Sequence, residues 1–254
     1  MIRGVGRCLG AALLTGVVMA AAPAPRSGYT DASPATRAMQ DDDSANPAFL
    51  WVQQGEALWS APAHDDGKSC ADCHGAPASM RGVAARYPAF DAARGRPLTL
   101  AQRINLCRST YQSAERLEQD SDALLSLTAL VGLQSRGMPV QVQQDGPIQP
   151  FHDEGARLYA TQFGQLNLSC HQCHDSLAGQ KLAGSLIPQG HANGYPLYRL
   201  EWQSMGSLYR RIRNCLTGVR ATPFAPDAPE LVAIEIYLAG RAQGLVVETP
   251  AVRP

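Results

Sequence analysis

The chain has 254 residues, of which 45% are apolar, and its 22 basic and 22 acidic residues give a formal net charge of zero. A neutral chain gives no reason to expect nucleic-acid binding, and no Walker or dinucleotide-binding glycine pattern is present. The apolar fraction supports real cores, and about 230 residues beyond the N-terminal leader are enough for two small domains.

Residues 1–22 have the features of a signal peptide. Two arginines precede a short apolar run, and small residues around Ala20 and Ala22 suit cleavage. The run is short and is followed by Pro23, so it does not predict a membrane span, although an uncleaved anchor is the alternative. We therefore expect a periplasmic protein whose mature form has no membrane span.

Residues 23–46 are rich in Pro, Ser and Ala and contain the acidic run Asp41-Asp42-Asp43. This composition predicts either a solvated tether or a lead-in that wraps around the body. It does not predict a domain of its own.

Two copies of Cys-x-x-Cys-His follow, and this pentapeptide is the attachment site of a c-type haem. The two thiols form thioether bonds with the porphyrin, and the His binds the iron. A zinc ribbon would place its cysteine pairs about 15–20 residues apart, whereas 96 residues lie between Cys73 and Cys170. A redox dithiol needs no adjacent His. The sequence therefore predicts two covalently bound haem c groups, at Cys70, Cys73 and His74 and at Cys170, Cys173 and His174.

The two haem motifs belong to a longer repeat with an offset of 100 positions. The matched pairs are Trp51 and Phe151, Gly55 and Gly155, Leu58 and Leu158, and Trp59 and Tyr159. Apolar runs of helical length follow at residues 124–133 and 231–238. This pattern predicts an all-α fold of two tandem cytochrome c-like domains related by internal duplication. We place them at residues 47–148 and 149–254, with the boundary near residues 145–150, where Gly, Pro and Gln interrupt the periodicity.

Two cysteines of the mature chain lie outside the haem motifs, and both follow the pattern Leu-x-x-Arg-Ile-x-x-Cys. They are Cys107, with Arg103, and Cys215, with Arg211. Residues four apart share one helical face, and a neighbouring guanidinium lowers a thiol pKa. A thiolate is also a good axial ligand of haem iron, so we expect Cys107 and Cys215 to bind the two irons opposite His74 and His174.

Two alternatives to these axial ligands stay open. The first is a disulfide between Cys107 and Cys215, which an oxidising compartment would permit. The second is methionine ligation of the first haem by Met138, although Leu245 stands at the corresponding place in the second half.

Four segments resemble the SoxA family, the catalytic subunits of the SoxAX cytochromes of sulfur oxidation. They are Arg103-Ile104-Asn105-Leu106-Cys107-Arg108, Gly164-Gln165-Leu166-Asn167-Leu168-Ser169-Cys170, Gly194-Tyr195-Pro196-Leu197-Tyr198-Arg199-Leu200-Glu201-Trp202-Gln203 and Arg210-Arg211-Ile212-Arg213-Asn214-Cys215. The resemblance implies an L-cysteine S-thiosulfotransferase. Such an enzyme joins thiosulfate oxidatively to a cysteine of the carrier SoxYZ and passes two electrons to c-type haem.

The resemblance also implies roles for individual residues. Cys215 matches the catalytic residue, which is a cysteine persulfide and the distal ligand of the active-site haem, and Arg211 matches the substrate-binding arginine. The first haem, with Cys107, matches a remote second haem. The implied partners are a monohaem SoxX-type subunit in a heterodimer, SoxYZ, thiosulfate and a downstream c-type cytochrome.

The stretch between Arg199 and Arg220 holds five arginines and one acidic residue. This local excess of positive charge suits a compact dianion such as thiosulfate. Pairing with haem propionates or a solvated face is the alternative for each arginine except Arg211. A dihaem electron carrier without catalysis is the alternative function, but a carrier has no use for a reactive thiolate beside an arginine.

Overall fold

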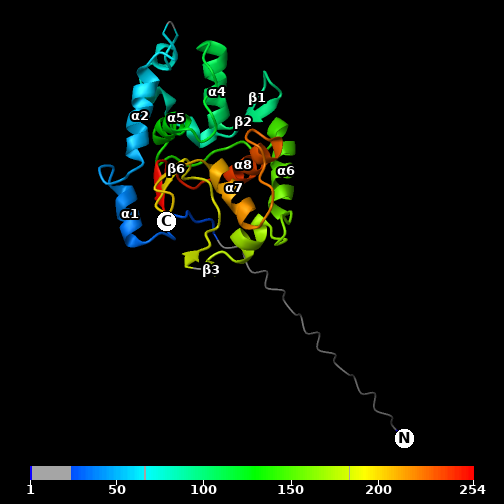
Figure 1. The fold of residues 1–254 in the computed structure, drawn as a ribbon. Helices are drawn as coiled ribbons and strands as arrows, with labels where there is room; N and C mark the ends of the chain where they lie inside the picture. Colours follow the sequence, from blue (N-terminus) through cyan, green and yellow to red (C-terminus); the bar gives the residue numbers. More distant parts are fainter. Residues whose placement is uncertain (2–23, 66, 183) are drawn as a thin grey trace.

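The computed structural model describes residue 1 and residues 24–65, 67–182 and 184–254. The predicted signal peptide therefore lies, apart from Met1, outside the described residues. Within the described part, no helix is long and apolar enough to cross a membrane. Figure 1 shows a mainly helical body, in which α2 and α5 lie on one side and α6 and α8 on the other.

Each half of the chain is built on a pair of crossing helices. The first half contains α2 (Phe49–Ser60), α3 (Ala71–His74), α4 (Leu100–Tyr111) and α5 (Asp122–Leu133). The second half contains α6 (Gln149–Ala160), the π-helical turn η4 (Gln172–Ser176), α7 (Leu208–Gly218) and α8 (Pro229–Arg241). The predicted helices at residues 124–133 and 231–238 are thus confirmed.

Glycine permits both crossings. A Cβ on Gly55 of α2 would run into the carbonyl oxygen of Ser126 in α5, and one on Gly155 of α6 into that of Ala233 in α8. The backbones therefore approach more closely than a side chain would allow. This explains why glycine occurs at the same place in both halves.

The predicted all-α class is too narrow, because short strands connect the helices. The hairpin of β1 (Ala89–Asp91) and β2 (Arg96–Leu98) precedes α4, and that of β5 (Leu197–Arg199) and β6 (Ser204–Gly206) precedes α7. A third hairpin joins β3 (Lys181–Leu182) to β4 (Ser185–Leu186), and β7 (Ala251–Arg253) pairs with β5 in parallel. Strands of two or three residues are too short to show an alternating pattern. The described part of the chain is mainly helical with three small hairpins.

Short helical segments complete the connections. They are α1 (Pro34–Asp41) and the 3-10 turns η1 (Pro77–Met80), η2 (Ala84–Arg86) and η3 (Gly146–Ile148). The last of these lies at the predicted boundary and leads directly into α6.

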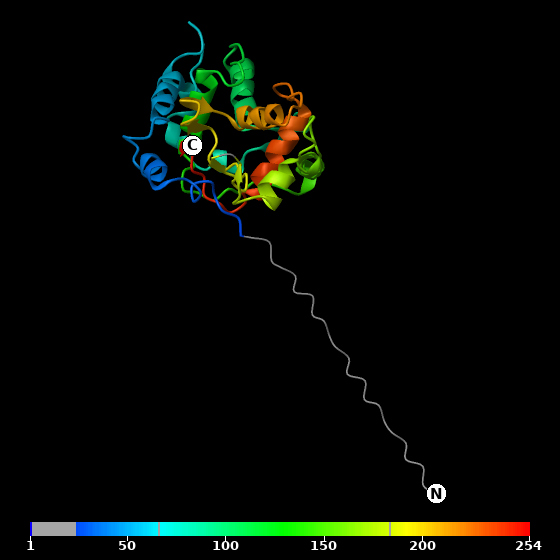
Figure 2. The same ribbon diagram turned by 60° about the horizontal axis from the view of Figure 1, so that its bottom comes forward.

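Residues 24–46 lie against the body beside the C-terminus (Figure 2). The Asn46 side-chain amide donates to the carbonyl oxygen of Pro250 at 2.9 Å, and the Gln40 side-chain oxygen accepts from the Val252 amide at 3.0 Å. Val252 belongs to the core of the first half, together with Val52 of α2. The C-terminal strand therefore helps to close the first half, and the lead-in covers that strand.

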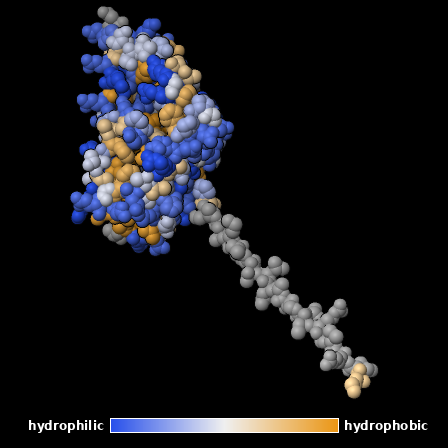
Figure 3. All heavy atoms as spheres, turned by 90° about the vertical axis from the view of Figure 1, so that its right-hand side faces the viewer, coloured by the Kyte–Doolittle hydropathy of each residue, from blue (hydrophilic) through white to orange (hydrophobic). Residues whose placement is uncertain are grey.

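A second core lies between α6, α7 and α8 and includes Leu158, Ile212 and Ile234. Large apolar side chains also remain exposed, among them Leu166, Leu177, Leu182 and Leu186 near the second haem motif. Figure 3 shows apolar and hydrophilic side chains interspersed on one face of the molecule.

Candidate functional site

Both haem motifs begin with the same reciprocal hydrogen bonds. In the second half, the Ser169 hydroxyl accepts from the Gln172 amide at 3.2 Å, and the Gln172 side-chain oxygen accepts from the Ser169 amide at 2.7 Å. Ser69 and Asp72 make the same two bonds in the first half. These bonds fix the start of each turn and so hold the two cysteines and the histidine in one helical turn.

His174 is oriented as an iron ligand requires. Its Nδ1 lies 2.8 Å from the carbonyl oxygen of Pro188, to which it donates, so Nε2 is left to bind a metal. Burial lowers the pKa of His174 and favours the neutral imidazole, which is the ligating form. Gly190 packs on the ring, where a Cβ would lie 2.9 Å from Cγ of His174. These residues fit a c-type haem.

Cys215 lies close to the second haem motif. Burial raises the pKa of the Cys170 thiol to about 11, and a thiolate at Cys215 contributes to this rise. The pKa of Cys173 is raised by the same two causes. On α7, Ile212 and Leu216 are buried in the core, whereas Arg211 and Cys215 are only partly covered. The helix therefore presents Arg211 and Cys215 together.

Cys107 has the same relation to the first motif. Burial raises the pKa of the Cys70 thiol, and a thiolate at Cys107 adds to this rise. Burial also raises the pKa of Cys107, with a smaller contribution from a thiolate at Cys73. Cys107 and Cys215 are both free thiols, so the structure contains no disulfide between them. The thioether of Met138 lies beside Gly82, where a Cβ would be 3.1 Å from Cε of Met138.

The expected lowering of the thiol pKa is wrong for Cys107. Burial raises the pKa of Cys107, and the charge and hydrogen bond of Arg103 oppose this only in part. Four-residue spacing identified a real neighbour, but it could not reveal how strongly the thiol is buried.

Cys215 and two arginines lie around Tyr195. Burial raises the pKa of the Tyr195 phenol, the charges of Arg211 and Arg199 lower it, and that of Cys215 raises it again. The sequence gave Arg211 a role, whereas Tyr195 and Arg199 appeared there without a role of their own, in the SoxA-like segment at residues 194–203.

The sequence analysis also missed a group of hydrogen bonds next to His174. An Nη of Arg241 donates to the Asp175 carboxylate at 2.5 Å and to the Gln189 carbonyl oxygen at 3.1 Å. Tyr159 donates to the same carboxylate at 3.2 Å.

An equivalent hydrogen bond occurs in the first half. Trp59, 100 positions before Tyr159, donates to the carbonyl oxygen of Gly75, 100 positions before Asp175, at 2.8 Å. That offset is the signal that could have found Asp175.

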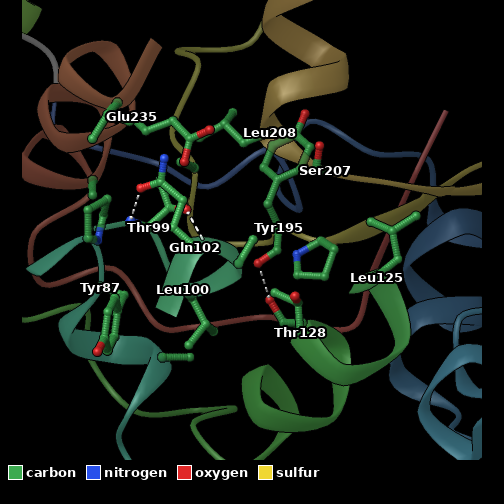
Figure 4. Close-up of a pocket in the computed structure, with 18 of the residues that line it drawn as sticks. Tyr87, Thr99, Leu100, Gln102, Leu125, Thr128, Tyr195, Ser207, Leu208 and Glu235 are labelled. Atoms are coloured by element: carbon green, nitrogen blue, oxygen red, sulfur yellow. Dashed lines mark hydrogen bonds between the residues drawn. The ribbon is translucent and has the colours of Figure 1, made fainter. Parts of the chain in front are cut away.

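A cavity of about 140 Å³ lies between the two halves (Figure 4). Gln102 comes from α4, Thr128 from α5, Ser207 from the start of α7 and Glu235 from α8. Burial raises the pKa of the Glu235 carboxyl to about 8, and the charges of Asp120 and Asp227 add to this. Glu235 is therefore mostly protonated at neutral pH.

We expect Glu235→Gln to stabilise the haem-loaded protein in alkaline solution. Because the folded pKa of about 8 lies above the ordinary 4.5, the native state loses stability as the pH rises from about 4.5 to 8, by roughly 5 kcal/mol at most. Glutamine removes this loss. Urea unfolding at pH 5 to 9 should give a difference in the free energy of unfolding that grows with pH. Glu230→Gln, on the exposed start of α8, is the control. Parallel curves for wild type and Glu235→Gln would contradict the prediction.

The family model of the SoxA/TsdA cytochrome c domain matches residues 54–140 and 154–247. L-cysteine S-thiosulfotransferase subunit SoxA of Rhodovulum sulfidophilum is 39% identical over 229 residues, which cover 90% of this chain and 80% of the relative. The protein of the same name from Pseudaminobacter salicylatoxidans is also 39% identical, over 89% of this chain and 80% of the relative.

A solved structure agrees in fold. The crystal structure of SoxXA from P. pantotrophus contains a chain that superposes with a TM-score of 0.87 at 36% identity. The match covers 90% of this chain and 86% of that one.

Proposed function

Because this chain belongs to the SoxA family of c-type cytochromes, we propose that it is the catalytic subunit of a periplasmic L-cysteine S-thiosulfotransferase. The observation that carries the proposal is the meeting of Cys215, on a helix that also presents Arg211, with the second haem motif. Signal-directed export of residues 23–254 is part of the proposal, because c-type haem is attached outside the cytoplasm.

We infer two covalently bound haem c groups. Cys70, Cys73, His74 and Cys107 would hold the first, and Cys170, Cys173, His174 and Cys215 would hold the second. Haem at these sites supplies the one-electron acceptors that oxidative coupling needs. The repeated caps, glycine crossings and hairpins support two duplicated domains at residues 47–148 and 149–254.

The proposed reaction joins thiosulfate to a cysteine thiol of a SoxYZ-type carrier. A new S–S bond forms between the carrier sulfur and the outer sulfur of thiosulfate, one proton is released, and two electrons leave. Arg211 would bind the thiosulfate dianion and turn its outer sulfur toward Cys215. Cys215, as a persulfide, would be the catalytic residue. A SoxX-type monohaem subunit and a downstream c-type cytochrome would carry the electrons away.

The alternative is a dihaem electron carrier without catalysis. Both functions need the haems, and they differ in the role of Cys215. An arginine on the same face as this cysteine, close to further positive charge, favours the enzyme, because electron transfer alone needs no anion site.

Reduction of an added c-type cytochrome tests the proposal. With a SoxX-type subunit present, reduction should require both thiosulfate and a SoxYZ-type carrier and should stop when the carrier cysteine is replaced by Ser. If the rate of cytochrome reduction did not depend on the SoxYZ-type protein, only the alternative function, a dihaem electron carrier, would remain.

We expect Cys107→Met to change the remote haem and spare turnover. Methionine is a competent axial ligand, but it donates less charge than a thiolate, so the reduction potential of the first haem should rise. Redox titration should show this rise, with thiosulfate turnover within about twofold of wild type. Loss of turnover comparable to that of a Cys215 variant would contradict the assignment of the first haem as remote.

A further inference from the structure

The hairpins before α4 and α7 are equivalent pieces of the two halves, with an offset of 108 positions. β1 and β5 begin at Ala89 and Leu197, and each follows a Tyr-Pro pair. The turns contain Gly95 and Gln203, both with positive φ. Thr99 and Ser207 then cap the following helices. Residues 91 and 199 therefore occupy the same place in the two halves.

An acidic residue stands at this place in the first half. The Asp91 carboxylate lies 3.1 Å from an Nη of Arg103 and 3.6 Å from one of Arg94. Its side chain is only 10% exposed. Arg103, the counterpart of Arg211, is therefore already neutralised by a buried carboxylate.

In the second half, a guanidinium stands at the same place. Arg199 is 16% exposed, and its Nε is buried without a hydrogen-bond partner among the described residues. Its outer Nη donates at 2.7 Å to Glu201, which is 64% exposed. The acidic partner of Arg199 thus lies on the solvent side and leaves the inner Nε–H free.

Stacking holds the Arg199 side chain in position. Its Cζ lies 5.2 Å from the ring centroid of Trp202, and Cζ of Arg210 lies 4.3 Å from the same centroid. Gly206 makes room for this ring, because a Cβ there would collide with Trp202. Arg199 is therefore preorganised, which lowers the entropic cost of binding an anion.

The equivalent tyrosines Tyr87 and Tyr195 therefore have differently charged surroundings. Arg103, Cys107 and Asp91 act on Tyr87, and their counterparts Arg211, Cys215 and Arg199 act on Tyr195. Burial and the charge of Arg211 both lower the pKa of Arg199, so the two guanidinium groups are close enough to repel each other. An ion pair in the first half is replaced by two like charges in the second.

We propose that Arg199 binds the sulfonate oxygens of thiosulfate beside Arg211, and that Asp91 closes the equivalent anion site in the first half. The inference rests on the proposed function and names a second substrate-binding residue for it. Two guanidinium groups can share the oxygens of one dianion, whose charge relieves their mutual repulsion.

Arg199→Gln tests the first part in the complete haem-loaded complex. We expect KM for thiosulfate to rise roughly tenfold to hundredfold, the range for losing a hydrogen bond to a charged group, with kcat within about twofold. The affinity for thiosulfate, measured by calorimetric titration without the SoxYZ-type carrier, should fall by a similar factor. Arg213→Gln, an exposed arginine of α7, is the matched control and should change neither value.

The main competing role for Arg199 is pairing with a haem propionate. In that case Arg199→Gln would shift the reduction potential of the second haem and leave thiosulfate affinity unchanged, and this result would overturn the proposal. Unchanged affinity with unchanged potential would overturn it too.

Asp91→Asn tests the second part. The substitution preserves size and frees Arg103, so calorimetry should detect a second, weaker thiosulfate per chain, where the wild type binds one. A single binding event in Asp91→Asn would show that Asp91 does not close the first site. Failure of the proposed function would look different, because the wild-type complex itself would then release no thiosulfate-dependent electrons.

Discussion

Cys215→Met should abolish thiosulfate-dependent electron release and leave a folded protein with both haems attached. The thioether bonds use other cysteines, methionine is a competent axial ligand, and position 215 is only partly buried, so the longer side chain has room. Methionine cannot carry a transferable sulfur, so the rate should fall at least about a thousandfold, as for loss of a catalytic nucleophile. Stopped-flow reduction of an added c-type cytochrome measures the rate, and the haem spectrum checks the fold.

Arg211→Ala should have an activity between those of the wild type and Cys215→Met. It should weaken thiosulfate binding while the nucleophile remains, so activity should fall less than in Cys215→Met. A normal rate for Cys215→Met would end the enzyme proposal and leave only electron transfer.

Gly155→Ala should clearly destabilise the second half without unfolding it. The new Cβ would run into the carbonyl oxygen of Ala233 and lie 2.8 Å from Cβ of Tyr237. Both neighbours belong to α8, so the two helices must separate. Overpacking of this kind costs about 1–3 kcal/mol, and a rigid backbone neighbour favours the upper end. Chemical denaturation of the haem-loaded protein measures the loss.

Gly218→Ala is the matched control for Gly155→Ala. Gly218 ends α7, and beyond its own helix and chain neighbours no described atom lies within 4 Å of the position that its Cβ would take. This substitution should be neutral or slightly stabilising. Equal stability of the two variants would show that the α6–α8 crossing tolerates a wider separation.

The sequence contained the main helices, because their signal is periodic over ten or more residues. The offset of 100 positions between the haem motifs also paired Gly55 with Gly155, the two positions at which the structure shows the helices to cross. The hairpins were missed, since three-residue strands carry no alternating pattern. Their pairing depends on tertiary contacts, as in the parallel pairing of β5 with β7 near the C-terminus.

The sequence analysis did not recognise Asp91 and Arg199 as equivalent positions of opposite charge, because the offset between the two halves changes along the chain. The offset is 100 at the haem motifs and 108 at the hairpins, so eight extra residues lie between His174 and Tyr195. The small hairpin of β3 and β4 lies in this stretch. Alignment on the haem motifs alone therefore compares Asp91 with the wrong residue.

Burial was the other quantity that spacing could not supply. The pattern Arg-Ile-x-x-Cys placed an arginine beside each thiol, but the raised pKa of Cys107 depends on the surrounding chain. The same holds for Glu235, which looks like an ordinary helical glutamate in the sequence and lines a cavity in the fold.

The mass of the carrier after reaction tests the central claim most directly. A SoxYZ-type carrier is incubated with the haem-loaded wild-type complex, thiosulfate and oxidised c-type cytochrome, and its intact mass is then measured. We expect the carrier cysteine to gain one thiosulfonate group for every two electrons delivered to the cytochrome. An unmodified carrier beside reduced cytochrome would contradict the account.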